Sequence, residues 1–205
     1  MSRNDVPSIP KVRIETLSDL VFGLALSIGA LTLIGKSPAT PGDLQSQILN
    51  FAFSFLILIS VWVGYTRIMS VLPVETGFVV LLNFVLLFLV SIEPYLLSLL
   101  GPGLGALHEF ESVLYALDLF GLISIEAFFS HVLTIEERKL VARALIHKQR
   151  IRRNGFIISA LLFLISALPQ FWVWRFEGIP VRILLWYCVL VVLWVTQLSG
   201  SGKSK

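Results

Sequence analysis

Six stretches of this chain are apolar over the length that is needed to cross a lipid bilayer. A spanning helix requires about 20 mostly apolar residues, and such runs are typical of transmembrane segments. Hydrophobic residues make up 56% of the 205 residues, charged residues only 14%, and the mean hydropathy is +0.86. The sequence predicts an all-α polytopic membrane protein, one domain over 1–205, with six transmembrane helices at 17–35, 48–69, 76–100, 112–134, 155–174 and 180–198. The first stretch lacks the cleavage pattern of a signal peptide, so we expect it to remain in the mature protein.

The basic residues predict the orientation of these helices. If the N-terminus is cytoplasmic, all of the 16 Lys and Arg residues except Lys36, Arg175 and Arg182 lie on the cytoplasmic side. Cytoplasmic loops of membrane proteins are rich in Lys and Arg, so we expect a cell-membrane protein with both termini in the cytoplasm. This bias explains the pI of about 9.2 without a nucleic-acid partner. The basic stretch 136–153 is expected to extend the fourth helix or to lie along lipid headgroups.

Motifs for enzymatic chemistry or a permanent cofactor are missing from the sequence. "GSGKS" at 200–204 lacks the first glycine and the preceding strand of a phosphate loop. "VGYT" at 63–66 is similar to a potassium-channel filter, yet it stands within a continuous helical pattern. The three histidines lie on separate segments, and Cys188 is the single cysteine. We therefore expect no enzyme, no cofactor and no resident metal.

Ionisable side chains at or inside the spans are candidates for function. A charge in the middle of a membrane helix costs about 2.5 to 3.5 kcal/mol on insertion scales unless it is paired or hydrated. Asp118 and Glu126 are interpreted either as hydrogen-bonded links between helices or as transport groups. Glu93, beside Pro94, is interpreted either as a carboxylate at the outer mouth or as a group that reaches out from a helix end.

The first helix carries two neighbouring stripes. Gly23, Ser27 and Ala30 are small and share a face, which permits close helix contact. Leu24, Ser27, Ile28 and Leu31 follow the spacing of a single helix face. This second stripe is compatible with ordinary helix packing, and it would line a narrow apolar conduit if several copies met on an axis.

Several segments resemble one family of ion channels. "RIETLSD" at 13–19 is similar to the R-x-x-x-F-S-D signature that opens the first helix in the transmembrane protein 175 family of potassium channels. "FLILISVWVGYTR" at 55–67, "LLNFVLLFLVSIEPYL" at 81–96 and "SVLYALDLF" at 112–120 are similar to the second, third and fourth helices of that family. The basic "RIRR" before the fifth span agrees as well.

This resemblance implies a homotetrameric, potassium-selective leak-type channel of the six-helix prokaryotic type, in which the first helix lines a central pore. It implies a hydrophobic constriction at Leu24, with further apolar layers at Ile28 and Leu31, and a polar layer at Ser27. Arg13, Ser18 and Asp19 would form a buried network that fixes the rotation of the first helix. The expected partners are potassium ions, the lipid bilayer and other copies of the chain.

The sequence departs from the family pattern in ways that affect the site. Leu17 replaces the Phe of the signature. Gly64, Tyr65 and Thr66 stand where the family carries Asn and His, so Tyr65 or another helix must supply hydrogen bonds to the network. Glu93 and Asp118 replace apolar and Asn residues, and we expect both, with Tyr65, to act at the pore mouth or as partners of the network.

Two alternatives from other classes stay open. The first is a small secondary transporter or proton pathway that uses Glu93, Asp118 and Glu126 as a relay. The second is a non-conducting scaffold that acts through the basic stretch 136–153. Inverted repeats with broken helices would favour the transporter, and no convincing pair is present in the sequence.

Overall fold

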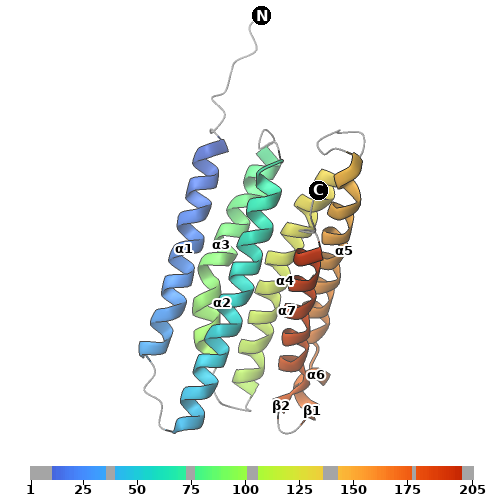
Figure 1. Ribbon diagram of the computed structural model, residues 1–205. Coiled ribbons are helices and arrows are strands. Elements are labelled where there is room, and N and C mark those ends of the chain that lie inside the picture. The colour runs from blue at the N-terminus through green and yellow to red at the C-terminus, as the bar shows by residue number, and fades with distance from the viewer. Residues whose placement is uncertain are drawn as a thin grey trace, which may run out of the picture.

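Six long helices lie side by side in the computed structural model, which describes residues 11–35, 40–72, 77–100, 106–135, 143–176 and 179–199 (Figure 1). The predicted all-helical architecture is confirmed, with one short helix and a two-stranded hairpin added within the described residues. The elements are α1 (Lys11–Gly35), α2 (Pro41–Met69), α3 (Gly77–Leu99), α4 (Ala106–Thr134), α5 (Arg143–Ser166), α6 (Gln170–Val173), β1 (Arg175–Phe176), β2 (Ile179–Pro180) and α7 (Val181–Ser199).

The order of the helices leaves α1 at one edge of the bundle. It packs on α3 and α2, whereas α4, α5 and α7 form the other side of the molecule (Figure 1). α1 begins and α7 ends toward the same end of the bundle, and α6 with the β1–β2 hairpin lies at the opposite end. The hairpin is antiparallel and pairs Arg175 with Pro180 and Phe176 with Ile179. α1 therefore has one packed side and one side that no other described element of the protomer covers.

α2 begins at Pro41, before the predicted start at residue 48, because polar groups cap its first turn. The Asp43 backbone N–H donates to the Thr40 hydroxyl at 3.2 Å, and the Thr40 N–H donates to the Asp43 carboxylate at 2.9 Å. Pro41 follows at the first helical position, where a missing N–H costs nothing. The helix then runs without interruption through Gly64 and Tyr65. "VGYT" is therefore helical, as predicted, and does not form a filter loop of stacked carbonyls.

Four of the long helices, α1 to α4, are long and apolar enough to cross a membrane. α7 contains a shorter apolar segment, Val181–Thr196. The first half of α5 carries a run of basic residues, and its apolar part begins only after Arg153. Six crossings therefore stay a prediction, although the described residues contain six long helices that overlap the six predicted spans.

The region of the fifth predicted span differs from the expectation. α5 ends at Ser166, and a turn leads into the short helix α6, so 155–174 is not one helix. Pro169 explains the break, because proline has no N–H to donate and disfavours helical geometry at the residue before it. The expectation that the basic stretch extends the fourth helix was also wrong: α4 ends at Thr134, and 143–153 are the first turns of α5.

Some expected features lie outside the described residues. They include Lys36, residues 136–142 of the basic stretch and the tail with "GSGKS" at 200–204.

The core of the bundle is apolar and rich in aromatic side chains. Tyr65, Tyr115, Phe129, Phe156 and Phe163 are fully buried between the helices. Many large apolar side chains are also exposed on every long helix. An apolar outer surface is what lipid requires, because the hydrocarbon core offers no water to polar groups.

Candidate functional site

The four residues predicted to line a pore share the open side of α1. Leu24 is 61% exposed, Ile28 39% and Leu31 60%, and Ser27 is exposed between them. The opposite side of the helix is packed, with Phe22 and Ala25 among its buried residues. The structure therefore brings the predicted stripe together on one face, which no other described element of the protomer covers.

Ser27 bonds locally within its own helix. Its hydroxyl donates to the carbonyl of Gly23 at 2.8 Å. This bond uses the only hydrogen of the hydroxyl and leaves the two lone pairs of its oxygen free. The oxygen can therefore still accept a hydrogen bond or contact a cation from the open face.

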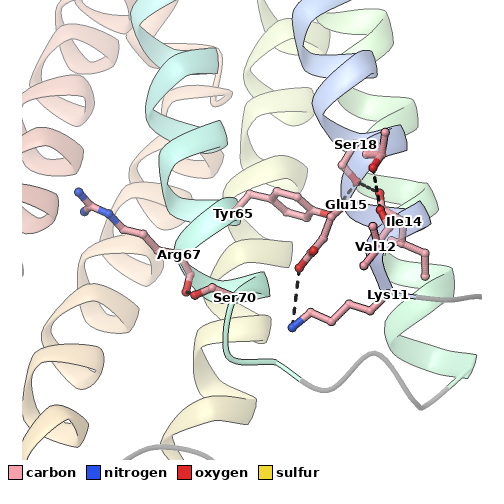
Figure 2. Close-up of polar contacts among 9 residues, drawn as sticks. Lys11, Val12, Ile14, Glu15, Ser18, Tyr65, Arg67 and Ser70 are labelled. Atoms are coloured by element: carbon pink, nitrogen blue, oxygen red, sulfur yellow. Dashed lines mark hydrogen bonds and ion pairs between the residues drawn. The ribbon is translucent and has the colours of Figure 1, made fainter.

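Ser18 connects α1 to α2 and α3 near the start of the helix. It is fully buried, and its hydroxyl donates to the carbonyl of Ile14 at 2.8 Å. The Tyr65 hydroxyl lies 2.6 Å from the Ser18 oxygen and must be the donor, because the hydrogen of Ser18 is already in use (Figure 2). Asn83 Nδ2 also donates to this oxygen, at 3.5 Å. Both lone pairs of Ser18 are thus occupied from neighbouring helices.

Asn83 was not predicted as part of this cluster. It is fully buried on α3, within the apolar segment "LLNFVLL". A single amide in a membrane segment also needs hydrogen-bond partners, and this signal was present in the sequence. Its Oδ1 has no partner in the described part of the chain.

Asp19 and Arg13 differ in their contacts. Trp62 on α2 donates its indole N–H to Asp19 Oδ1 at 3.0 Å, so this carboxylate also ties α1 to α2. Arg13 is exposed, and among the described residues it forms no hydrogen bond or ion pair. The ion pair at this end of α1 joins Lys11 and Glu15, 3.7 Å apart (Figure 2). Among the described residues of one protomer, Ser18 and Asp19 therefore bond to neighbouring helices and Arg13 does not. Because Asp19 and Arg13 are both exposed, the three residues do not form the expected buried network within one protomer.

Glu93 lies inside the protomer and not at a mouth. It is 0% exposed, and its Oε1 accepts from the Ser54 hydroxyl at 2.6 Å and from the Tyr115 hydroxyl at 2.7 Å. The expectation of a mouth carboxylate or an outward-reaching helix end does not hold, because α2 and α4 cover the side chain. Asp118 is also buried, 5% exposed, three residues after Tyr115 on α4. Tyr65 is likewise buried, as a partner of Ser18.

Glu126 occupies a separate position on α4. It is fully buried, and neither of its oxygens has a hydrogen-bond partner among the described residues. A Cβ atom on Gly64 would lie 2.5 Å from Glu126 Oε1 and 3.1 Å from the ring of Phe156. The glycine in "VGYT" therefore allows α2 to approach α4 and α5 closely, and this explains its presence without a filter.

Arg182 is a buried residue that the sequence placed among the outside charges. It is 0% exposed, and its guanidinium donates to the carbonyls of Ser166, Ala167 and Leu168 at 2.7, 3.2 and 3.1 Å. It also donates to the Ser112 hydroxyl and stands over the ring of Trp172. These carbonyls close the C-terminal end of α5, where the helix dipole favours a positive charge. Arg182 thus joins α4, α5 and α7.

Metal-binding groups of the usual kind are not found in the described part of the chain. No three His, Cys, Asp or Glu side chains gather there in a way that could hold a metal ion. Cys188 is a free, exposed thiol on α7.

Comparison with known proteins relates this fold and site to one family. Residues 13–94, which include most of α1, all of α2 and most of α3, match the model of the endosomal/lysosomal potassium channel TMEM175. No curated protein matches the chain.

Solved structures agree over nearly the whole length. A lysosomal potassium-selective channel TMEM175 homolog from Chamaesiphon Minutus has a TM-score of 0.63 at 20% identity, covering 93% of this chain and 97% of that one. A variant of the potassium channel MtTMEM175, in complex with a nanobody–MBP fusion protein, has a TM-score of 0.55 at 19% identity and covers 99% of both chains. The resemblance to the TMEM175 family that the sequence indicated is therefore confirmed, by sequence over residues 13–94 and by fold over nearly the whole chain.

Proposed function

We propose that this chain is the protomer of a potassium-selective, leak-type cation channel. The match to a potassium channel family over α1 to α3 supports this proposal, and so do the channel structures that share the fold. The observation that carries it is the open face of α1 from Leu20 to Leu31, where the exposed side chains are apolar except for Ser27. A helix with one packed and one open side at the edge of a bundle is suited to meet copies of itself.

Four copies of the chain would place these open faces around a central axis. In this arrangement all six long helices cross the bilayer, and both termini lie in the cytoplasm. The other exposed apolar side chains then face lipid, as the hydrophobic thickness of a membrane requires.

The apolar residues of the stripe would form the narrow part of the pathway. Leu24 supplies the constriction, and Ile28 and Leu31 supply further layers toward the other end of α1. A ring of leucine side chains excludes both water and ions when it is narrow. Opening would require dilation of the ring or rotation of α1.

Ser27 would supply the oxygens that favour potassium. Four hydroxyl oxygens near the axis could replace part of the hydration shell of the ion, and potassium sheds water at a lower cost than sodium. The bond from Ser27 to Gly23 supports this role, because it turns the lone pairs, and not the hydrogen, toward the open side.

The cluster at the start of α1 would fix the rotation that this pathway needs. Ser18 is held by Tyr65 and Asn83, and Asp19 by Trp62, so the two neighbouring helices hold α1 at two successive residues. Arg13 would join this network only through residues of another copy of the chain, or through residues of its own chain outside the described ranges. These contacts would act on the pore without touching the ion.

Reconstituted flux tests the proposal directly. Liposomes with a potassium gradient should release potassium through the full-length protein and not through protein-free membranes. In planar bilayers the reversal potential should follow the potassium gradient. A reversal potential that shifts with pH instead would indicate a proton-coupled carrier, and the absence of any current or flux would support a scaffold.

A further inference from the structure

A cavity lies between α2, α3, α4 and α7, at the end of the bundle that carries α6 (Figure 1). Its volume is about 70 Å³, which is several times the roughly 10 to 15 Å³ that one water molecule needs. Phe53, Leu97, Trp172 and Trp186 line it and are at most 8% exposed. A water molecule needs about two to four polar partners, so these apolar and aromatic walls favour a hydrocarbon group.

The mouth of the cavity lies between α2 and α7. Among the residues that line the cavity, Asn50 on α2 and Tyr187 on α7 are the exposed ones. Beside them on the same helices, the apolar side chains of Leu49 and Val191 are 50% and 61% exposed. The mouth therefore continues into the apolar outer surface, which faces hydrocarbon in a membrane.

A second hollow, of about 30 Å³, adjoins the cavity on the side of α1. The two share Asn50, Leu97 and Leu100 in their walls. The second hollow is the more polar one, because Gln47 and Ser98 line it beside Asn50. Together they form one elongated groove with a polar end and an aromatic end. This shape fits a chain with a polar group at one end better than it fits a compact ring.

The polar groups of the groove are uncharged or weakly basic. No Lys, Arg, Asp or Glu is among the described residues that line it. Arg182 bonds to Ser112 in the wall, but all five of its N–H groups already donate to protein oxygens. Asn50 and His108, by contrast, form no hydrogen bond with another described residue. An amide and an imidazole beside an apolar cavity suit an uncharged acceptor, such as an ester carbonyl.

We propose that this groove binds one ester-linked acyl chain of a membrane lipid in each protomer. The hydrocarbon next to the ester fills the aromatic cavity, and the ester carbonyl accepts a hydrogen bond from Asn50 or His108. The level in the bilayer agrees, because Leu97 lies two residues before the end of α3 and His108 two residues after the start of α4. Ester groups lie where the hydrocarbon core of the membrane ends. The head group stays outside the groove.

This lipid site is separate from the proposed pathway on α1. The cavity is lined from α2, α3, α4, α6 and α7, whereas the stripe of Leu24, Ser27, Ile28 and Leu31 faces the open side of α1. The bound chain would fill the space between α2 and α7 and hold these helices together. The proposal requires a bilayer around the chain, but it does not depend on conduction.

Photolabelling of the full-length protein in liposomes tests the site. The reagent is phosphatidylcholine whose ester-linked acyl chain carries a diazirine close to the ester, diluted in unlabelled phosphatidylcholine. Surrounding lipid reaches exposed side chains such as Val195, whereas only a bound chain reaches Phe53 and Trp186, which are 5% and 4% exposed. We expect adducts on all three residues. The adducts on the two buried aromatic residues should saturate as the fraction of the reagent rises, because the site holds one chain.

Filling the cavity should remove this labelling. Ile183→Trp adds bulk to the wall from α7 and should lower the adducts on the buried aromatic residues at least tenfold, while those on Val195 stay unchanged. Leu97→Phe adds bulk from α3 and should act in the same way, so either variant suffices if the other does not fold. Val191→Trp places the same new side chain on the exposed face of α7 and should be labelled as the wild type is.

A competition experiment tests the polar end of the groove. Unlabelled ester-linked phosphatidylcholine should displace the reagent from the wild type several-fold better than the corresponding ether-linked lipid, which has no carbonyl. The double variant Asn50→Leu with His108→Phe should lose this preference. Equal competition by the two lipids in the wild type would reject an ester-linked ligand.

Three labelling results would also overturn the proposal. Adducts on Val195 alone, both in liposomes and in lipid–detergent micelles that separate the copies, would leave only water in the groove. Adducts on Phe53 and Trp186 that appear only after the copies are separated would show that a second copy of the chain covers the mouth. Unchanged labelling in both Ile183→Trp and Leu97→Phe would place the lipid elsewhere.

Discussion

Ser18 and Ser27 are the same residue type on the same helix, and their surroundings give them different chemistry. Both hydroxyls donate to the carbonyl four residues earlier, to Ile14 and Gly23 respectively. The oxygen of Ser18 then accepts from Tyr65 and Asn83, whereas the oxygen of Ser27 faces outward with free lone pairs. Nine residues separate them, which is two and a half turns, so they lie on opposite sides of α1.

Ser27→Ala should reduce potassium selectivity without disturbing assembly. The change removes the only hydroxyl on the stripe and alters little volume, whereas Ser27→Thr keeps the hydroxyl and should keep the selectivity. The measurement is the bi-ionic reversal potential for potassium and sodium in the wild type and both variants. Equal potentials in all three would assign Ser27 to helix packing, as expected for a hydroxyl whose whole role is its bond to Gly23.

The two sides of helix α1 have different roles. Its packed side is tied to α2 and α3 near the start of the helix by Ser18 and Asp19, and its open side carries Leu24 and Leu31. A rotation of α1 by one residue, about 100°, would replace the open stripe with a different set of side chains. The contacts at the start of the helix therefore matter for the pathway although they lie away from it.

Asp19→Ala and Trp62→Phe should weaken the same contact. Each removes the bond between the indole and the carboxylate, so we expect a loss of about 1 kcal/mol in either variant and no further loss in the double variant. The fraction of protein that migrates as the oligomer should fall, while the potassium to sodium permeability ratio of the remaining channels stays unchanged. Thr16→Ala, an exposed position that bonds only to Val12, serves as the matched control. Normal assembly with lost selectivity would contradict the structural role.

Cysteine accessibility separates the two sides of α1. In a background in which Cys188 is replaced, Leu24→Cys should react with a small water-soluble thiol reagent, and the current should change on modification. Ala25→Cys, the next residue but on the packed side, should be protected, because Ala25 is buried. Protection of Leu24→Cys in every functional state would place the conduit elsewhere.

At the scale of the whole molecule, Arg182 holds the end of the bundle opposite to the start of α1. One guanidinium binds carbonyls after α5, the hydroxyl of Ser112 on α4 and the ring of Trp172 on α6, from its own position on α7. α6 and the β1–β2 hairpin lie between α5 and α7 in the sequence. The side chain of Arg182 therefore links the start of α7 directly to the end of α5.

Arg182→Met should destabilise the protein strongly. The variant leaves the carbonyls of Ser166, Ala167 and Leu168 without their charged donor, and we expect a loss of about 2 to 4 kcal/mol, seen as a clear fall in Tm. Arg175→Gln removes an exposed charge from the nearby strand β1 and should change the Tm little. A similar Tm for both variants would show that the buried contacts contribute no net stability.

The sequence alone was sufficient for the features that depend on local pattern. Runs of apolar residues locate five of the six long helices, whereas the fifth predicted span overlaps only the second half of α5 and continues past its end at Ser166. The stripe Leu24, Ser27, Ile28 and Leu31 follows from helical spacing. The interpretation of "VGYT" as helical rests on the same continuity. Such features need no knowledge of neighbours, because hydropathy and helical period act over one or a few turns.

Other features were decided by the tertiary structure. Glu93 was expected at a pore mouth or a helix end, but it is buried and bonds to Ser54 and Tyr115. Arg182 was counted among the charges on the outside of the membrane, but it is fully buried. Asn83 was not predicted as a site residue, but it contacts Ser18. In each case at least one partner comes from a different helix, 16 or more residues away in sequence. Hydropathy shows that a polar residue in a membrane needs a partner, but only the packing of the helices determines which group supplies it.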